Sequence, residues 1–141
     1  MTYSYNIDGR DFGSAGAASS DIKKKLRQLG LPSKLIKRTA IAMYEAEINM
    51  VIHADGGTTE VIIESDRIIL EFRDTGPGIP DIDLAMSEGY STASDEARQL
   101  GFGAGMGLPN IKRNVDRLDI TSSPGKGTAI SMTIGITGDA G

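Results

Sequence analysis

The sequence predicts an α+β domain, in which helices lie on one face of a mixed, mostly antiparallel sheet. Two alternating runs rich in β-branched residues, 59–64 and 67–73, are separated by Ser65 and Asp66 and predict an antiparallel hairpin. Two helical segments precede this hairpin, and a second pair of strands follows near the end of the chain. At 141 residues the chain fits one domain, which we expect to span residues 1–141.

The N-terminal part is expected to contain one strand and two helices. Residues 2–7 alternate weakly between polar and apolar and predict a short edge strand. Ser20 or Asp21 is a suitable N-cap for a first helix, which Gly30 closes. A second helix is expected over about 32–54, because a run of glycines then interrupts the helical pattern.

The C-terminal part is expected to contain two further helices and two further strands. Residues 80–88 predict a short helix, and residues 89–105 lack periodicity and predict a long functional loop. A helix over about 109–117 is favoured, because proline is well tolerated in the first turn. Strands are expected over 119–123 and 128–134.

Composition excludes several classes of function. The formal net charge is −4, and acidic and basic residues are mixed along the chain without a basic stripe for nucleic acid. The chain has no cysteine, so it can form neither disulfides nor thiolate metal sites. No stretch approaches the roughly 18 apolar residues of a membrane span, and the N-terminus does not resemble a signal peptide. We therefore expect a cytoplasmic protein with no membrane partner.

Three polar residues recur every fourth position along the second predicted helix: Glu45, Asn49 and His53. Residues four apart lie on the same side of a helix, so they form one polar stripe. The adjoining arc is apolar, which places the stripe at the edge of the buried face; it comprises Ile41, Tyr44, Ile48, Val51 and Ile52. A carboxylate there can act as a general base, and an amide oxygen can ligate Mg²⁺. The alternative is a polar trio on the helix surface.

Asp74 ends a predicted strand and is followed by the turn-forming residues 75–79. This arrangement exposes a carboxylate at the floor of a pocket, where it can accept a hydrogen bond from the exocyclic amine of adenine. The alternative is a structural turn in which Asp74 binds backbone N–H groups. The Asp-Thr-Gly tripeptide of aspartic proteases is disfavoured, because Arg73 precedes it and the helical stripe would stay unexplained.

Residues 101–108 carry glycine at every second position and continue directly into a predicted helix. Backbone N–H groups of glycines can approach an anion closely, and a helix N-terminus adds partial positive charge, which together favour polyphosphate. The alternative is a flexible linker. The segment is not the G-x-G-x-x-G of Rossmann domains, and Lys126 lacks the context of a P-loop.

In their order and spacing these motifs resemble the GHKL (Bergerat-fold) ATPases, the group that includes gyrase, Hsp90, histidine kinases and MutL. The resemblance covers about residues 35–134. The matching segments are 45–49 (N box), 74–79 (G1 box), 103–108 (G2 box) and the Gly127-Thr128 step. The resemblance implies a two-layer α/β sandwich that binds ATP and Mg²⁺ beneath an ATP lid at about 80–107.

The resemblance also implies roles for individual residues. Glu45 would be the catalytic base, Asn49 the Mg²⁺ ligand and His53 an orienting residue. Asp74 would bind the adenine amine, and Thr128 would form a hydrogen bond near it. The remaining positions would line the nucleotide through their backbone: Gly76, Gly78, Ile79, Gly101, Gly103, Ala104, Gly105, Met106, Gly107 and Leu108.

Within this family, segments 88–92 and 106–113 look most like the anti-sigma factor and switch-protein serine kinases of the RsbW, SpoIIAB and RsbT type. This implies a serine/threonine protein kinase that transfers the ATP γ-phosphate to a small STAS-domain partner. A sigma factor or a PP2C-type phosphatase is a further expected partner, and formation of a homodimer is left open.

One departure from this group concerns the lid arginine, since Gly103 and Ala104 occupy the place where those kinases tend to carry it. Arg98 and Lys112 are the available substitutes. Two alternatives therefore stay open beside the kinase: a nucleotide-dependent binding module with little or no turnover, and a detached ATPase of another GHKL branch.

Overall fold

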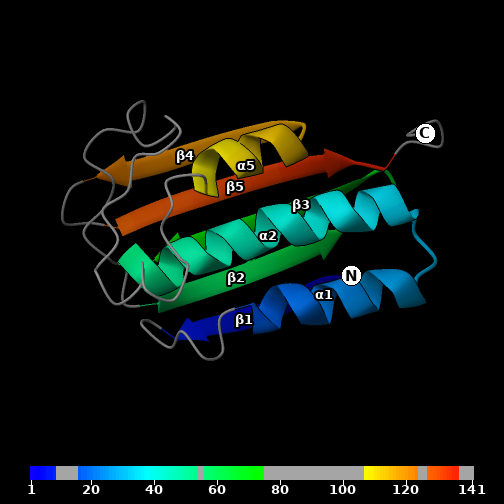
Figure 1. Ribbon diagram of the computed structural model, residues 1–141, viewed down its shortest axis with the longest axis horizontal. Coiled ribbons are helices and arrows are strands. Elements are labelled where there is room, and N and C mark those ends of the chain that lie inside the picture. Colours follow the sequence, from blue (N-terminus) through cyan, green and yellow to red (C-terminus); the bar gives the residue numbers. More distant parts are fainter. Residues whose placement is uncertain (9–15, 54–55, 75–106, 124–126, 137–141) are drawn as a thin grey trace.

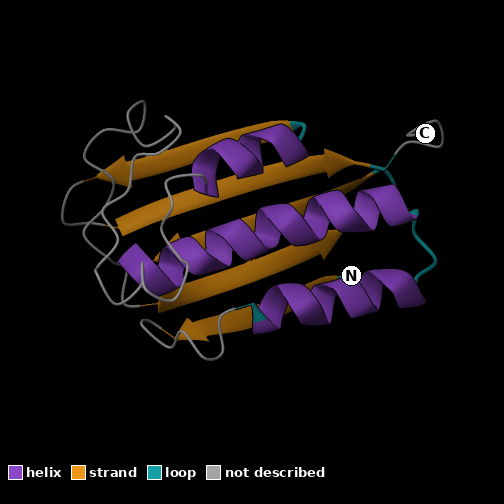
Figure 2. Cartoon of the chain, in the orientation of Figure 1, coloured by secondary structure: helices purple, strands orange, loops and turns teal. Residues whose placement is uncertain are grey.

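The computed structural model describes residues 1–8, 16–53, 56–74, 107–123 and 127–136. In this part of the chain, five strands form one antiparallel sheet and three helices cover one of its faces (Figures 1 and 2). The elements are β1 (Thr2–Asp8), α1 (Ala17–Gln28), α2 (Ser33–His53), β2 (Gly56–Ile63), β3 (Arg67–Asp74), α5 (Gly107–Asn114), β4 (Arg117–Ser123) and β5 (Gly127–Gly135). The α+β class predicted from the sequence is confirmed. The helix predicted over 80–88 and the loop over 89–105 lie outside the described residues.

The strands follow the order β1-β2-β3-β5-β4, so the predicted hairpin β2–β3 lies within the sheet and β1 is an edge strand, as expected. Strand β2 begins at Gly56, earlier than the predicted start at Thr59. Gly57 pairs with Asp74, and a Cβ atom at this glycine would overlap the Arg73 carbonyl oxygen and the Met50 methyl group. The glycine therefore permits close packing between strand and helix, and it lies within β2 instead of in a break before the strand.

Helix α1 begins at Ala17, several residues before the predicted caps Ser20 and Asp21, so that prediction was wrong. The N-cap residue is Gly16, which has a positive φ of 95° and makes no side-chain capping bond. The missing cap is supplied by Glu47 of α2, whose carboxylate accepts hydrogen bonds from backbone N–H groups at the start of α1. A tertiary contact therefore sets the start of the helix. Its end agrees with the prediction, with Gly30 at a φ of 75°.

Helix α5 ends at Asn114, before the predicted boundary at about Arg117. The chain turns into β4 because Asp116 bonds to the neighbouring strand: its backbone N–H donates to the Thr133 carbonyl oxygen at 2.9 Å. Its carboxylate accepts the Gly135 N–H at 2.7 Å and the guanidinium of Arg38 at 3.0 Å. These bonds compete with continuation of the helix and fix its C-terminal end.

The core lies between the sheet and the central helix α2, which runs between α1 and α5 (Figure 1). Along β3 alternate side chains are buried, as expected for a strand with one covered face. Large apolar side chains from both layers meet there, including Met43, Met50, Leu70, Phe72, Met132 and Ile134. Burial of each such side chain stabilises the fold by about 1.5–3 kcal/mol relative to exposure. None of the described helices combines the length and apolar character needed to cross a bilayer.

The apolar arc predicted on α2 is partly correct. Ile48 and Val51 are buried and Ile41 is partly buried, whereas the side chain of Ile52 is not described. Tyr44 is 38% exposed, so its assignment to the buried face was wrong. The Tyr44 ring lies against Gly16, and a Cβ atom added to Gly16 would come within 2.9 Å of this ring.

Candidate functional site

The two glutamates of α2 face different neighbours. Glu45 contacts α5 on one side, and Glu47 contacts the start of α1 on the other. This division follows from the helix itself, because residues two apart differ in direction by about 200°. The two carboxylates therefore have separate roles, although they are separated in sequence by a single alanine.

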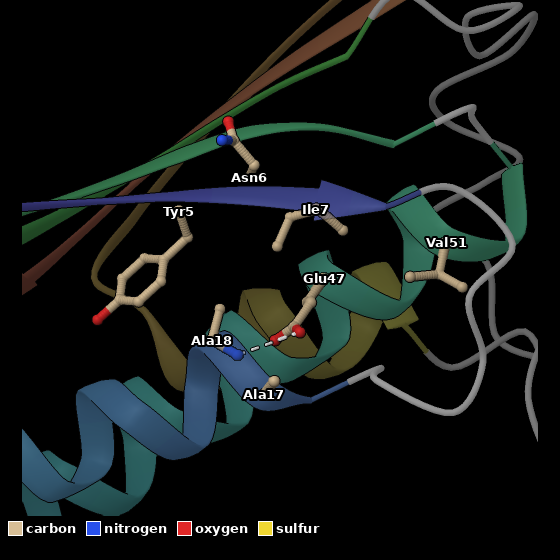
Figure 3. A pocket seen from close by; sticks show the side chains of 7 residues that line it. All are labelled: Tyr5, Asn6, Ile7, Ala17, Ala18, Glu47 and Val51. Carbon is tan, nitrogen blue, oxygen red and sulfur yellow. Dashed lines mark hydrogen bonds between the residues drawn. The ribbon is translucent and has the colours of Figure 1, made fainter.

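Glu47 is 2% exposed and serves the fold. Its Oε2 accepts the N–H groups of Gly16 at 2.8 Å and Ala18 at 3.3 Å, and its Oε1 accepts that of Ser19 at 3.1 Å. A negative charge at a helix N-terminus is favourable, since the unpaired N–H groups there carry partial positive charge. Glu47 lines a pocket of about 290 Å³ between β1, α1 and α2, shown in Figure 3 with its bond to Ala18.

Glu45 has an environment that suits proton transfer. Its side chain is half-buried beside α5, and its Oε1 accepts a hydrogen bond from Asn110 Nδ2 at 3.3 Å. Burial raises the pKa of Glu45 above its ordinary value, and the bond from Asn110 opposes this rise. A carboxylate with a raised pKa is a stronger base, and a general base works best when its pKa approaches the working pH.

The other two residues of the predicted stripe lie further along the same helix. Asn49 is half-buried one turn beyond Glu45, as expected for the edge of the buried face. His53 is the last residue of α2, and its side chain lies outside the described residues. The structure thus agrees with the prediction that Glu45 and Asn49 lie on the same side of α2.

Asp74 ends β3 and meets the start of β5. Its Oδ1 accepts the backbone N–H of Thr128 at 3.2 Å. The Thr128 hydroxyl lies 3.0 Å from that of Ser122, which pairs with it in register across β4 and β5. The sequence placed Thr128 beside Asp74 through the family resemblance, and the geometry agrees. Ser122 was missed, because only the strand register brings it to this end.

The stripe and Asp74 lie toward the same end of the molecule. Figure 1 shows the C-terminal end of α2 and the start of β5 at that end. The pairing of Asp74 with Gly57, which also lies against Met50 of α2, brings the end of β3 close to this helix. Helix α5 flanks α2 on the side of Glu45.

The predicted glycine segment enters the described structure only at its end. Gly107 is the first residue of α5, and Leu108 is 6% exposed within the core. The side chain of Leu108 therefore anchors the helix, and a contact with nucleotide would come from its backbone. The other predicted nucleotide contacts lie outside the described residues: Gly76, Gly78, Ile79, Gly101, Gly103, Ala104, Gly105 and Met106.

Sequence reasoning missed Asn110 as well. It lies one turn into α5 and is the residue whose side chain contacts Glu45. The available signal was its place just after the glycine segment, on a helix expected to lie near the phosphates. That signal did not show which side of α5 faces α2.

Comparison with known families identifies this arrangement. Residues 36–137 match the model of the histidine kinase-, DNA gyrase B- and HSP90-like ATPases. The chain belongs to this family. As an ATPase-family domain it carries the two-layer fold expected from the resemblance, with Glu45, Asn49, Asp74 and Thr128 inside the matched region.

Among individual relatives of this ATPase-family domain, an anti-sigma F factor of Thermoanaerobacter sp. (strain X514) is 36% identical over 97 residues, covering 65% of this chain and 64% of that protein. The serine/threonine-protein kinase RsbT of Bacillus subtilis (strain 168) is 34% identical over 110 residues, covering 74% of this chain and 75% of that protein. The chain therefore spans somewhat less than two thirds of the anti-sigma F factor.

A crystal structure of the RsbU and RsbW domains of a Mycobacterium tuberculosis protein resembles the chain with a TM-score of 0.64. The identity is 15%, and the match covers 95% of this chain and 31% of that one. At this identity the likeness shows the fold alone.

Proposed function

We propose that the chain is a Mg²⁺- and ATP-dependent serine/threonine protein kinase of a partner-switching system. The observation that carries the proposal is Glu45: a half-buried carboxylate with a raised pKa, on the helix to which the family resemblance assigns the catalytic base. The kinase RsbT and the anti-sigma F factor among the relatives support the reaction class. The expected phosphate acceptor is a serine or threonine of a small STAS-domain protein, and a sigma factor or a PP2C-type phosphatase is the further partner.

ATP would bind with its adenine toward Asp74. A carboxylate only accepts hydrogen bonds, so it suits the exocyclic amine of adenine, and it can accept from more than one donor at once. The bond from the Thr128 N–H fixes the direction of this carboxylate. The phosphates would then extend toward the start of α5, where backbone N–H groups and the helix dipole favour anions.

Glu45 would act on the hydroxyl group of the acceptor. As the hydroxyl oxygen attacks the γ-phosphorus, its proton moves to the Glu45 carboxylate, the bond to the β–γ bridging oxygen breaks, and ADP leaves. Most of the catalysis would come from positioning and charge stabilisation, as in phosphoryl transfer generally.

Asn49 is the proposed Mg²⁺ ligand. The described residues contain no cluster of three or more His, Cys, Asp or Glu side chains that could hold a metal by themselves. This fits Mg²⁺, which is usually held by few protein ligands together with substrate phosphates and waters. The ion would neutralise charge on the phosphates, and the amide oxygen of Asn49 would hold it one turn from Glu45.

The direct test is to incubate the protein with Mg²⁺, γ-labelled ATP and a candidate STAS-domain partner. Transfer of the label to a serine or threonine of the partner supports the kinase. Tight ATP binding with no labelling of any serine or threonine would refute it.

A second function, a nucleotide-dependent binding module, is favoured by the absence of the lid arginine at Gly103 and Ala104. Of the two substitutes, Lys112 is exposed on α5 and Arg98 lies outside the described residues. In a pure binding module, Glu45→Ala would leave both partner binding and biological output intact. Loss of output with preserved ATP affinity would exclude this alternative.

A further inference from the structure

We propose that Asn110 is a positioning residue for Glu45, and that Arg113 sets the direction of its amide group. This inference rests on the proposed role of Glu45 as the base. The contacts form a short chain along α5 into α2. Arg113 Nη1 donates to Asn110 Oδ1 at 3.2 Å, and Asn110 Nδ2 donates to Glu45 Oε1 at 3.3 Å.

The orientation of the Asn110 amide follows from the chemistry of its neighbours. A guanidinium group has only donors, and an ionised carboxylate has only acceptors. The amide has one end of each kind, so its oxygen must face Arg113 and its nitrogen must face Glu45. The reversed amide would set donor against donor on one side and acceptor against acceptor on the other.

The helix that carries Asn110 is fixed at several points. Leu108 and Ile111 lie on either side of Asn110 in the sequence and are 6% and 0% exposed, so they anchor α5 in the core. At the far end of α5, Arg38 Nε donates to the Asn114 carbonyl oxygen at 3.1 Å. A functional side chain is positioned best from a rigid element with supporting bonds. Asn110 therefore contacts Glu45 from a helix that is held in place.

The consequence for Glu45 concerns rotation of its carboxyl group. The last torsion of a glutamate side chain is broad, so an unsupported carboxyl group samples many directions. A hydrogen bond on Oε1 narrows this range and so fixes the direction of Oε2. The same bond favours the ionised form of the carboxylate and opposes the effect of burial on its pKa. Asn110 thus keeps the half-buried Glu45 carboxylate both oriented and charged.

The activity test compares four single variants in single-turnover transfer of the γ-phosphate, with ATP affinity measured separately by calorimetry. Asn110→Ala should slow transfer roughly 10-fold to 100-fold and change the ATP Kd less than about threefold, because misdirection of a reacting group acts on the chemical step. Asn110→Gln should keep part of the rate, and Asn110→Asp should lose the most. Asn114→Ala is the matched control, because the Asn114 side chain bonds the Asn110 backbone carbonyl oxygen at 2.8 Å and, within the part of the chain that the structure describes, makes no hydrogen bond to Glu45.

A double-mutant cycle separates positioning from general support of the fold. If Asn110 acts through Glu45, Asn110→Ala should not slow the Glu45→Gln protein further, since the group it positions is already gone. Additive losses, or a wild-type rate in Asn110→Ala, would overturn the proposal while leaving the kinase function standing.

An NMR measurement keeps the proposal testable if transfer is absent or a variant fails to fold. In the uniformly ¹⁵N-labelled protein, Glu45→Ala should shift the side-chain NH₂ signal of Asn110 and leave that of Asn114 in place. An unchanged Asn110 signal would overturn the positioning contact. Absence of transfer in the wild-type protein, with this shift observed, would refute the kinase function alone.

Discussion

The bonds between Glu47 and the start of α1 make a quantitative prediction about stability. The carboxylate is 2% exposed and accepts three backbone N–H groups at 2.8, 3.3 and 3.1 Å. In Glu47→Gln one oxygen becomes an NH₂ group, so whichever way the amide turns, it opposes at least one backbone donor. A hydrogen bond to a charged group contributes about 1.5–3 kcal/mol, so the loss of one or two predicts a decrease of about 1.5–6 kcal/mol. Glu47→Ala removes all three and leaves a cavity, so it should cost about 5 kcal/mol or more.

The assay is urea unfolding followed by circular dichroism, with Glu60→Gln as the matched control. Glu60 lies exposed on β2, so its change should stay within about 0.5 kcal/mol of the wild type. Hydrogen exchange of the α1 amides would show whether the loss is local or spreads to the core through Ile22 and Leu26, both 0% exposed. A Glu47→Gln protein as stable as the Glu60→Gln control would refute the assignment of Glu47 as the cap of α1.

Three further predictions concern the site and its surroundings. Asp74→Asn should weaken ATP binding roughly 10-fold or more, because the amide oxygen would turn to the Thr128 N–H and leave the NH₂ group facing the adenine amine. Calorimetry with ATP and with a purine analogue lacking that amine checks this. An undiminished preference for ATP over the analogue would contradict it. The Gly135 N–H, more than the nearby guanidinium, lowers the pKa of Asp116. The ionised carboxylate therefore stabilises the fold above the ordinary aspartate pKa, and this stabilisation is lost as the pH falls through the lowered value. Asp116→Asn should remove this pH-dependent loss from urea unfolding, a measurable effect that stays below about 1 kcal/mol because the group is exposed, and an unchanged pH profile would contradict this. Burial raises the pKa of Glu45, so ionisation of this group destabilises the fold once the pH exceeds the ordinary glutamate pKa. Glu45→Gln should therefore raise the free energy of unfolding at neutral pH by less than about 1 kcal/mol. A lower free energy of unfolding in Glu45→Gln would contradict the effect of burial.

The elements set by local pattern could be predicted from the sequence. The alternating runs around Ser65 gave the hairpin, and the spacing of Glu45 and Asn49 gave their common side on α2. The contact of Asp74 with Thr128 was expected only from the family resemblance, because the two residues are 54 positions apart and no local pattern links them. Their place beside each other depends on the strand order β3-β5, which sequence pattern alone does not specify.

Features set by contacts between distant elements were predicted less well. The cap of α1 comes from Glu47, 28 to 31 residues further along the chain, so the local capping signal at Ser20 was misleading. The contact of Asn110 with Glu45 spans 65 residues and depends on how α5 packs against α2. Each of these bonds requires the packed helices, and no local pattern encodes their relative orientation.

Glu45 is expected to serve the chemical step, while other parts of the site hold ATP. The most direct test is single-turnover transfer of the γ-phosphate to a STAS-domain partner by the wild-type and Glu45→Gln proteins, with the ATP Kd measured on both. We expect Glu45→Gln to bind ATP with nearly unchanged affinity and to lose transfer by roughly 100-fold or more, because a general base has been removed. Transfer at the wild-type rate by Glu45→Gln would rule out Glu45 as the general base.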